Sequence, residues 1–169
     1  MVLEKYLPEY QFNEVHKIVV EGSTEDCYKA SMNLDLSKSG IIAFLFRLRG
    51  LPFSNTHLAA LTKDMRFTLL EEIQYTEFLY AFWFKSQPEW ITDKEEFMRG
   101  SSCYNAKVGW SFNFVEKGNG KTEIITETRV FCLNRKTKLL FSIYWFFIRP
   151  FSGLIRIQML RLIKKELEK

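Results

Sequence analysis

Apolar and polar residues alternate most regularly in the middle of the chain, over residues 104–115. One set of alternate positions holds Tyr, Ala, Val, Trp and Phe, whereas the other set is mostly Asn, Lys, Gly and Ser. A period of two with one apolar side is typical of a half-buried strand in an antiparallel sheet. A turn at residues 117–120 and a segment rich in β-formers at 122–133 follow, so the sequence predicts a β-hairpin.

The same period predicts further strands on the N-terminal side of this hairpin. Residues 10–20 alternate and end at Gly22, and a period of two begins again near Arg66. Residues 76–85 are a nearly continuous run of β-formers, with apolar side chains on both faces. We therefore expect one strand at the start of the chain and a run of antiparallel strands in its second half.

Short helices are expected between the first strand and the others. Ser23 can cap the free amides of a helix, and Asp26 can reach back to complete the cap. Residues 41–49 are apolar and indicate a second short helix, which ends at the Gly-Leu-Pro sequence of residues 50–52. Residues 55–64 form either another helical turn or a loop.

The period lengthens after Asn134, and residues 137–167 read as a helix with a kink or break at Pro150 and Gly153. Its apolar stripe beyond the break consists of Ile155, Met159, Leu162 and Ile163. A sheet with an apolar face must be covered, and this helix is the only predicted element long enough to cover it. The sequence therefore predicts one α+β domain over residues 1–169, with a strongly curved antiparallel sheet wrapped around a long C-terminal helix.

Three stretches also carry a resemblance to a known family. In residues 16–28, HKIVVEGSTEDCY, an alternating strand runs into a small residue and then a capped helix. The second and third stretches are TETRV at 126–130, and Tyr144-Trp145 followed by RPFSGLIR at 149–156. Together they resemble the START-related (SRPBCC) superfamily of helix-grip proteins, with its Bet v 1-like and polyketide cyclase-like members, and within it a bacterial branch. The resemblance implies a START-like domain with a cavity between sheet and helix, and it implies no catalytic residues.

Aromatic residues are unusually frequent, with 16 Phe, 7 Tyr and 4 Trp. Large flat side chains pack with gaps and often line ligand pockets. We expect the wall of a cavity to include Tyr80, Phe82, Trp110, Phe112, Tyr144 and Trp145. Alternatively, these six side chains fill the core and leave no large void.

Polar residues on the same strand faces are candidates for the polar end of such a cavity. Glu14 and His16 share the inward face of the first strand, and Glu127 and Arg129 share one face of the strand expected beside it. They could hold the polar end of a ligand or move a proton, or they could form a structural network of paired groups. The alternation also allows the opposite orientation, with Glu127 and Arg129 in solvent. The inward positions would then be Thr126, Thr128, Val130 and Cys132.

Several classes of function are disfavoured by the sequence. His16 and His57 stand far apart, and HExxH and CxxC motifs are absent, so we expect neither a metal nor a cofactor. Three cysteines, Cys27, Cys103 and Cys132, and an N-terminus without a secretory signal predict the reducing cytoplasm. The net charge of +4 is spread along the chain, which argues against a nucleic-acid partner.

Membrane contact is the remaining question raised by the apolar run at residues 139–148. This run is too short to span a bilayer, which needs about 20 apolar residues. Basic residues gather after it, and we interpret them as a solvated helix face, with contact to an anionic membrane surface as the alternative. They are Arg149, Arg156, Arg161, Lys164, Lys165 and Lys169.

The leading hypothesis is a non-enzymatic protein that binds a small hydrophobic or amphipathic molecule in a pocket of roughly 300 Å³ or more. A second hypothesis is a cofactor-free cyclase or hydrolase of aromatic ketides, which requires a titratable pair inside the pocket. A third is peripheral association with membranes through residues 139–163. It requires that Trp145, Phe146 and Phe147 be exposed. The sequence predicts no oligomeric state.

Overall fold

The structure, a computed structural model, describes residues 1–48, 50 and 56–168. Its strands form one antiparallel sheet in the order β1-β6-β5-β3-β2, with β4 paired to β3. These strands are β1 Phe12–Glu21, β2 Thr68–Ile73, β3 Glu77–Phe84, β4 Pro88–Glu89, β5 Ala106–Gly118 and β6 Lys121–Cys132. The helices are α1 Val2–Tyr6, α2 Thr24–Met32, α3 Gly40–Leu48, α4 Leu58–Asp64, α5 Lys94–Arg99 and α6 Arg135–Leu167, with a 3-10 turn, η1, at Leu36–Lys38.

The predicted strands and hairpin are confirmed. β5 and β6 pair over their whole length, and β1 pairs with β6, which brings the first strand beside the last one. The turn between β5 and β6 places Gly118, Asn119 and Gly120 at positive φ, a conformation that Gly and Asn adopt at low cost.

The helices after the first strand are confirmed as well. The Ser23 hydroxyl accepts a hydrogen bond from the Asp26 amide at 3.1 Å, which caps α2 as expected. Of the two possibilities for residues 55–64, the helix is observed, since α4 begins at Leu58. The end predicted for the preceding helix, at Arg49 and residues 51–52, lies outside the described residues.

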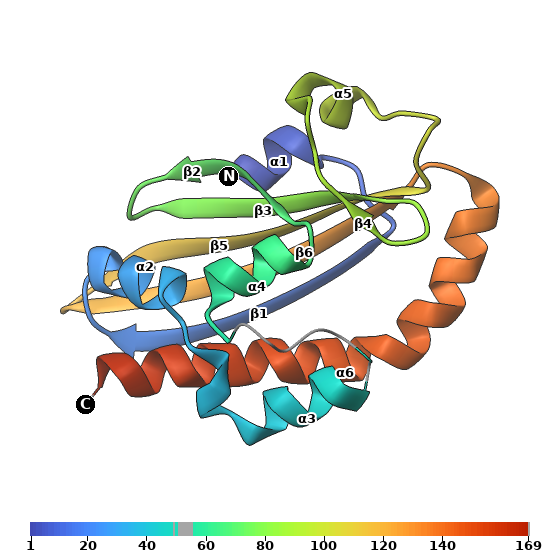
Figure 1. The fold of residues 1–169 in the computed structure, drawn as a ribbon. Coiled ribbons are helices and arrows are strands. Elements are labelled where there is room, and N and C mark those ends of the chain that lie inside the picture. The colour runs from blue at the N-terminus through green and yellow to red at the C-terminus, as the bar shows by residue number, and fades with distance from the viewer. Residues whose placement is uncertain (49, 51–55, 169) are drawn as a thin grey trace.

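The predicted fold class is confirmed, because the sheet curls around α6 (Figure 1). The second half of α6, residues 151–167, runs along the concave face of the sheet and buries Met159, Leu160 and Ile163. These side chains belong to one core cluster with Phe112 of β5 and Ile124 of β6, both fully buried. Removal of this apolar surface from water is what holds the helix in the sheet.

The convex face of the sheet is covered too, by α1 and α5. Leu3 and Leu7 pack there against Leu79 and Trp83 of β3. Gly109 permits this approach, because a Cβ atom at that position would lie 2.9 Å from Leu3 Cδ1. A strand that is apolar on both faces, as β3 is, must be buried on both. The sequence therefore held the signal for this outer layer, although α1 itself was not predicted.

The helix α6 changes direction at about its midpoint, where Pro150 lies within it (Figure 1). Proline has no amide hydrogen and its ring crowds the preceding turn, so helices bend there. Gly153, one turn further on, is buried against β1, and a Cβ atom there would lie 2.5 Å from Glu14 Oε1. The first half of α6, residues 135–150, consequently leaves the direction of the strands and stands at the end of the sheet.

Candidate ligand-binding cavity

A cavity of about 570 Å³ lies where the first half of α6 diverges from the sheet. Its wall on the side of the sheet includes Phe82, Phe84, Val108, Trp110, Thr128 and Val130. On the side of α6 it includes Phe141, Tyr144, Trp145, Ile148 and Arg156. The helix α4 contributes Leu58 and Leu61. The lining is therefore mainly aliphatic and aromatic, as in most small-molecule sites.

Of the six aromatic residues predicted for the cavity wall, Phe82, Trp110, Tyr144 and Trp145 line this cavity. The other two are buried in the packed part of the core. The Phe112 ring stacks on Phe78 at 5.0 Å between centroids, and Tyr80 meets the edge of the same ring at 5.8 Å. Both interpretations of these aromatic residues thus hold in part. Side chains fill the space between the sheet and α6 at one end of the sheet, and this space stays open at the other end.

Glu14 and His16 face inward on β1, as predicted, but they meet α6 at Gly153 and are not among the described residues that line the cavity. His16 Nε2 lies 3.0 Å from Glu14 Oε1, so the two side chains form a hydrogen-bonded pair. Gly153 makes this contact possible, since any larger residue would displace the pair. The geometry is that of a structural contact between strand and helix.

Glu127 and Arg129 lie on the opposite face of the sheet, below α1. Arg129 Nε donates to Glu127 Oε1 at 2.7 Å, Nη1 donates to the Leu7 carbonyl at 2.9 Å, and Nη2 donates to Glu4 Oε1. Its guanidinium also lies over the Tyr10 ring, 4.5 Å from the centroid. Although burial lowers the pKa of Arg129, its hydrogen bonds to Glu4 and Glu127 raise that pKa above the ordinary value overall.

The structure therefore does not bring the four predicted polar residues together. Glu14 stands opposite Thr128 in the register of β1 and β6, so Thr128 and not Glu127 shares its face. The alternative orientation of the last strand, with Thr126 and Thr128 inward, is the observed one. Glu127 and Arg129 are nevertheless buried instead of solvated, because α1 covers them.

Arg156 is the residue of the cavity that the sequence reasoning missed. It was grouped with the solvated basic residues, but its Nη2 donates to Thr128 Oγ1 at 2.6 Å and its Nη1 donates to Ser152 Oγ at 2.5 Å. The guanidinium carbon lies 5.6 Å from the centroid of the Trp110 ring. The spacing of Ser152, Arg156 and Met159 places them on one helix face, and that spacing could have identified Arg156 as an inward residue.

The charged groups of the cavity have one sign. Among the described residues that line it, Lys85 and Arg156 are the charged ones, and none is Asp, Glu or His. Lys85, Leu140 and Tyr144 are exposed and mark the rim, whereas Arg156 is half-buried. Within the described part of the chain, no group of three or more His, Cys, Asp or Glu could hold a metal ion. The arrangement is an apolar chamber with cationic polar ends.

Comparisons with known proteins show similar folds at low identity. No protein-family model matches the chain, and no curated protein matches its sequence. A Helicobacter pylori hypothetical protein aligns with a TM-score of 0.45, 12% identity, and coverage of 97% of this chain and 93% of its own. A conserved protein from Geobacillus kaustophilus gives 0.39, 12%, and 93% and 95%. An aromatase/cyclase from a Streptomyces species gives 0.35, 8%, and 93% of both chains.

These TM-scores lie below 0.5, so the similarities carry no inference about what this chain binds. The arrangement itself is plain in the described residues: a curved antiparallel sheet grips a long C-terminal helix, and a cavity remains where that helix bends away.

Proposed function

We propose that this protein binds a small amphipathic molecule whose apolar part fills the cavity and whose anionic end lies beside Arg156. The observation that carries the proposal is the lining: apolar side chains surround a chamber whose charged members, among the described residues, are cations. Its volume of about 570 Å³ lies within the range of small-molecule pockets, about 300–1,000 Å³. Binding in the cytoplasm, without a cofactor, is part of the same proposal.

The two parts of the ligand contribute differently to binding. Transfer of an aliphatic or aromatic body from water to this lining supplies most of the binding free energy. The guanidinium of Arg156 supplies selectivity, because its planar fork matches a carboxylate and its attraction is stronger away from bulk water. Ser152 and Thr128 hold the guanidinium in place, so little side-chain entropy remains to be lost on binding.

Binding is favoured over catalysis by the kinds of side chain present. Acid–base chemistry draws mainly on His, Asp and Glu, and the described lining residues include none of these. Glu14, His16, Glu127 and Arg129 are the groups predicted for an enzyme. Their hydrogen bonds go to one another, to Glu4 and to the Leu7 carbonyl, away from the cavity.

The test compares an acid with the alcohol of the same chain length. Dodecanoic acid and 1-dodecanol each displace a fluorescent dansylated fatty acid from the wild-type protein and from Arg156→Gln. We expect the substitution to weaken binding of the acid at least about tenfold, the usual cost of a lost charge-assisted hydrogen bond. The affinity for the alcohol should change by less than about twofold. Arg161→Gln, at an exposed position of the same helix, is the matched control and leaves both ligands unchanged.

Thermal melting of each variant shows whether it is folded, and Arg156→Lys retains the charge if Arg156→Gln is unstable. The proposal fails if wild-type protein binds neither compound, or if Arg156→Gln weakens the acid and the alcohol equally.

A further inference from the structure

The first half of α6 exposes a stripe of large apolar side chains to solvent. Leu139, Ile143, Phe146 and Phe147 follow the spacing i, i+4, i+7, i+8, which places them on one face of the helix. Their exposed fractions are 66%, 56%, 76% and 66%. The cavity lies against another face of this helix, so these residues do not serve the pocket. Scattered single apolar residues are normal on surfaces, whereas a contiguous stripe indicates an interaction site.

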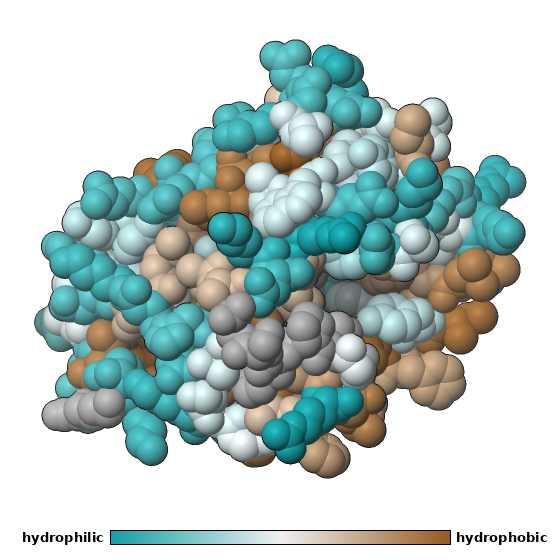
Figure 2. Space-filling view, viewed as in Figure 1, coloured by the Kyte–Doolittle hydropathy of each residue, from teal (hydrophilic) through white to brown (hydrophobic). Residues whose placement is uncertain are grey.

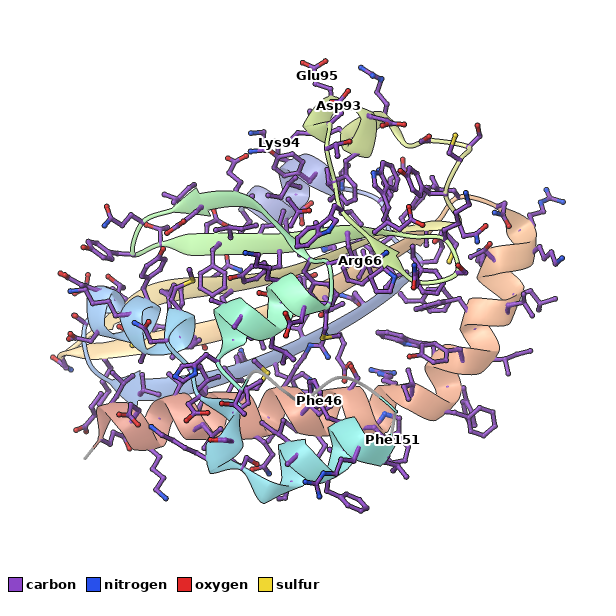
Figure 3. All side chains as sticks on the ribbon, in the orientation of Figure 1. Phe46, Arg66, Asp93, Lys94, Glu95 and Phe151 are labelled. Carbon is purple, nitrogen blue, oxygen red and sulfur yellow. The ribbon has the colours of Figure 1, made fainter. Side chains whose placement is uncertain are left out.

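A second exposed stripe lies on α3, which contacts α6. Ile41, Phe44 and Leu48, spaced i, i+3, i+7, are 46%, 63% and 61% exposed. Phe46 is on the opposite side of α3 and lines the cavity, and Figure 3 labels it together with Phe151 of α6 in the region of these two contacting helices. Figure 2 shows hydrophobic side chains gathered at the right and lower right of the view, where the first half of α6 lies in Figure 1. We name the two stripes together, with their residues as given, the α3–α6 surface.

Basic residues predominate along the chain beside the two stripes, although Lys38 forms an ion pair with Glu166 of α6 at 3.0 Å. Residues 134–165 include eight Lys and Arg and no Asp or Glu, and residues 36–48 include Lys38 and Arg47 and no acidic residue. Arg135, Lys138 and Arg149 are exposed and fall on the helix face beside the apolar stripe of α6. An apolar face bordered by Lys and Arg is typical of helices that lie in the interface of an anionic bilayer.

We propose that the α3–α6 surface docks on the surface of a membrane that contains anionic phospholipid. The apolar stripes insert at the level of the acyl chains, and the basic residues meet the phosphate groups, each with a favourable contribution near a negative surface. This inference does not rest on the proposed ligand, because the residues that carry it point away from the cavity.

Two other arrangements fit the observations less well. A second copy of the chain on this surface would bring Arg135, Lys138 and Arg149 against the same cations, without carboxylates nearby in sequence to offset them. By length and composition, α6 is long and apolar enough to cross a membrane, and little of its most apolar stretch is buried. Spanning, however, would pull Ile155, Met159 and Ile163 out of the core. The protein therefore lies on the bilayer instead of crossing it.

Flotation with lipid vesicles tests the proposal on the full-length protein. We expect the wild-type protein to float with vesicles of phosphatidylcholine and about 30% phosphatidylglycerol at low salt, and to bind pure phosphatidylcholine at least about tenfold more weakly. Raising NaCl to about 0.5 M is expected to weaken binding to the anionic vesicles several-fold, because salt screens the basic residues.

Matched variants distinguish vesicle binding through the α3–α6 surface from nonspecific adsorption of exposed apolar residues. L139S/I143S is expected to lower vesicle binding at least about tenfold. L69S/I73S removes the same two residue types from exposed positions on β2 and is expected to change it less than about twofold. R135Q/K138Q/R149Q is expected to abolish the dependence on phosphatidylglycerol, whereas K63Q/K94Q/K121Q, at exposed positions on other elements, preserves it. Circular dichroism spectra confirm that each variant is folded.

Three results would overturn the proposal. The first is absence of flotation of the wild-type protein at low salt with anionic vesicles. The second is an equal loss of binding in L139S/I143S and L69S/I73S. The third is a dimer in light scattering that L139S/I143S converts to a monomer without any vesicle binding by either form, which would assign the surface to a second copy of the chain.

Discussion

Two buried or half-buried arginines show how one residue type takes different roles according to its surroundings. Arg129 is held by Glu4, Glu127 and a backbone carbonyl below α1, so its charge is neutralised within the fold. Arg156 is held by the hydroxyls of Ser152 and Thr128 at the wall of an apolar cavity. The first arrangement stabilises the contact of α1 with the sheet, and the second fixes a guanidinium at the wall of the cavity.

The ion pair of Glu4 with Arg129 predicts a specific response to acid. The hydrogen bond from Arg129 holds the pKa of Glu4 below its ordinary value of 4.5. A depressed pKa means that the pair stabilises the fold above that ordinary value, and that this stabilisation is lost as the pH falls through the lowered pKa. Because Glu4 is half exposed, Glu4→Gln is expected to cost at most about 1 kcal/mol at pH 7.

Urea denaturation of wild type and Glu4→Gln at a series of pH values measures this. The difference in free energy of unfolding should be constant between about pH 6 and 8 and should vanish in acid below the lowered pKa. Glu116→Gln, at an exposed position on β5, serves as the control. A difference that grows in acid would contradict the assignment.

Gly153 is expected to be intolerant of any side chain. Gly→Ala usually stabilises a helix by about 1 kcal/mol, but a Cβ atom here would lie 2.5 Å from Glu14 Oε1 and 3.2 Å from His16 Nε2. Gly153→Ala should therefore lower the free energy of unfolding by about 1–3 kcal/mol. Gly40→Ala, at the start of α3 with no heavy atom within 4 Å of the new Cβ, should be neutral or stabilising in the same urea titration.

At the scale of elements, the roles of the first and the last helix differ from what their lengths suggest. α1 is only five residues long, yet it carries Leu3, and positions Leu7 just after it, in the core on the convex face. α6 is 33 residues long, and its second half lies along the concave face of the sheet, whereas its first half meets the sheet through Phe141 and Trp145. The proline between the halves separates a structural segment from one that forms a cavity wall on one side and the α3–α6 surface on another.

Replacement of a buried α1 side chain by Ala tests whether this short helix is part of the stable fold. Leu3 is fully buried, so Leu3→Ala is expected to lower the free energy of unfolding by about 2–4 kcal/mol. Leu139→Ala removes the same atoms from an exposed position and should change it by less than about 0.5 kcal/mol. Chemical denaturation measures both values, and equal effects would mean that α1 does not pack as described.

At the scale of the whole molecule, the cavity results from a mismatch between a curved sheet and a bent helix. Where α6 follows the strands, aromatic and aliphatic side chains fill the space, as Phe78 and Phe112 do. Where α6 turns away at the end of the sheet, Phe141 and Trp145 still pack on Phe12 of β1, but about 570 Å³ beside them stays open. The bilayer proposed above would lie beside this open end, since Leu140 and Tyr144 of the rim belong to the same half of α6.

Filling variants test this division of the interior. Val108 lines the cavity, so Val108→Phe should change the free energy of unfolding by no more than about 1 kcal/mol. It should weaken binding of the fluorescent fatty acid at least about tenfold, because the new ring occupies the cavity. Ile124 lies on the same concave face in the packed region, and Ile124→Phe should cost about 1–3 kcal/mol through overpacking. The description of the cavity is contradicted if Val108→Phe is the more destabilising of the two, or if it leaves fatty-acid binding unchanged.

Much of the fold could be read from the chain because the signals are local. The strand alternation of residues 104–115, the cap at Ser23 and the apolar stripe after Gly153 each depend on residues a few positions apart. The partnership of β1 with β6 and the bend near Pro150 were also predictable, from the order of the elements and from the chemistry of proline.

The candidate site was predictable only in part. Phe82, Trp110, Tyr144 and Trp145 were identified from alternation and composition, and they line the cavity. Tyr80 and Phe112 lie on the same face of the sheet as Phe82 and Trp110, but in the packed part of the core. No local signal separates these two groups, because both are aromatic residues on the inward face.

By itself, then, the sequence determined the order and the type of the five long strands and of α2, α3 and α6, since backbone propensity and the burial of one face act over short distances. It did not determine the short elements α1, β4 and α5. Tertiary structure alone decided which face of β6 turns inward, since both faces carry apolar residues and α1 is available to cover the other. It also decided that the inward face at Arg156 borders a cavity instead of packed core, because this depends on where the bend in α6 places that turn relative to the sheet.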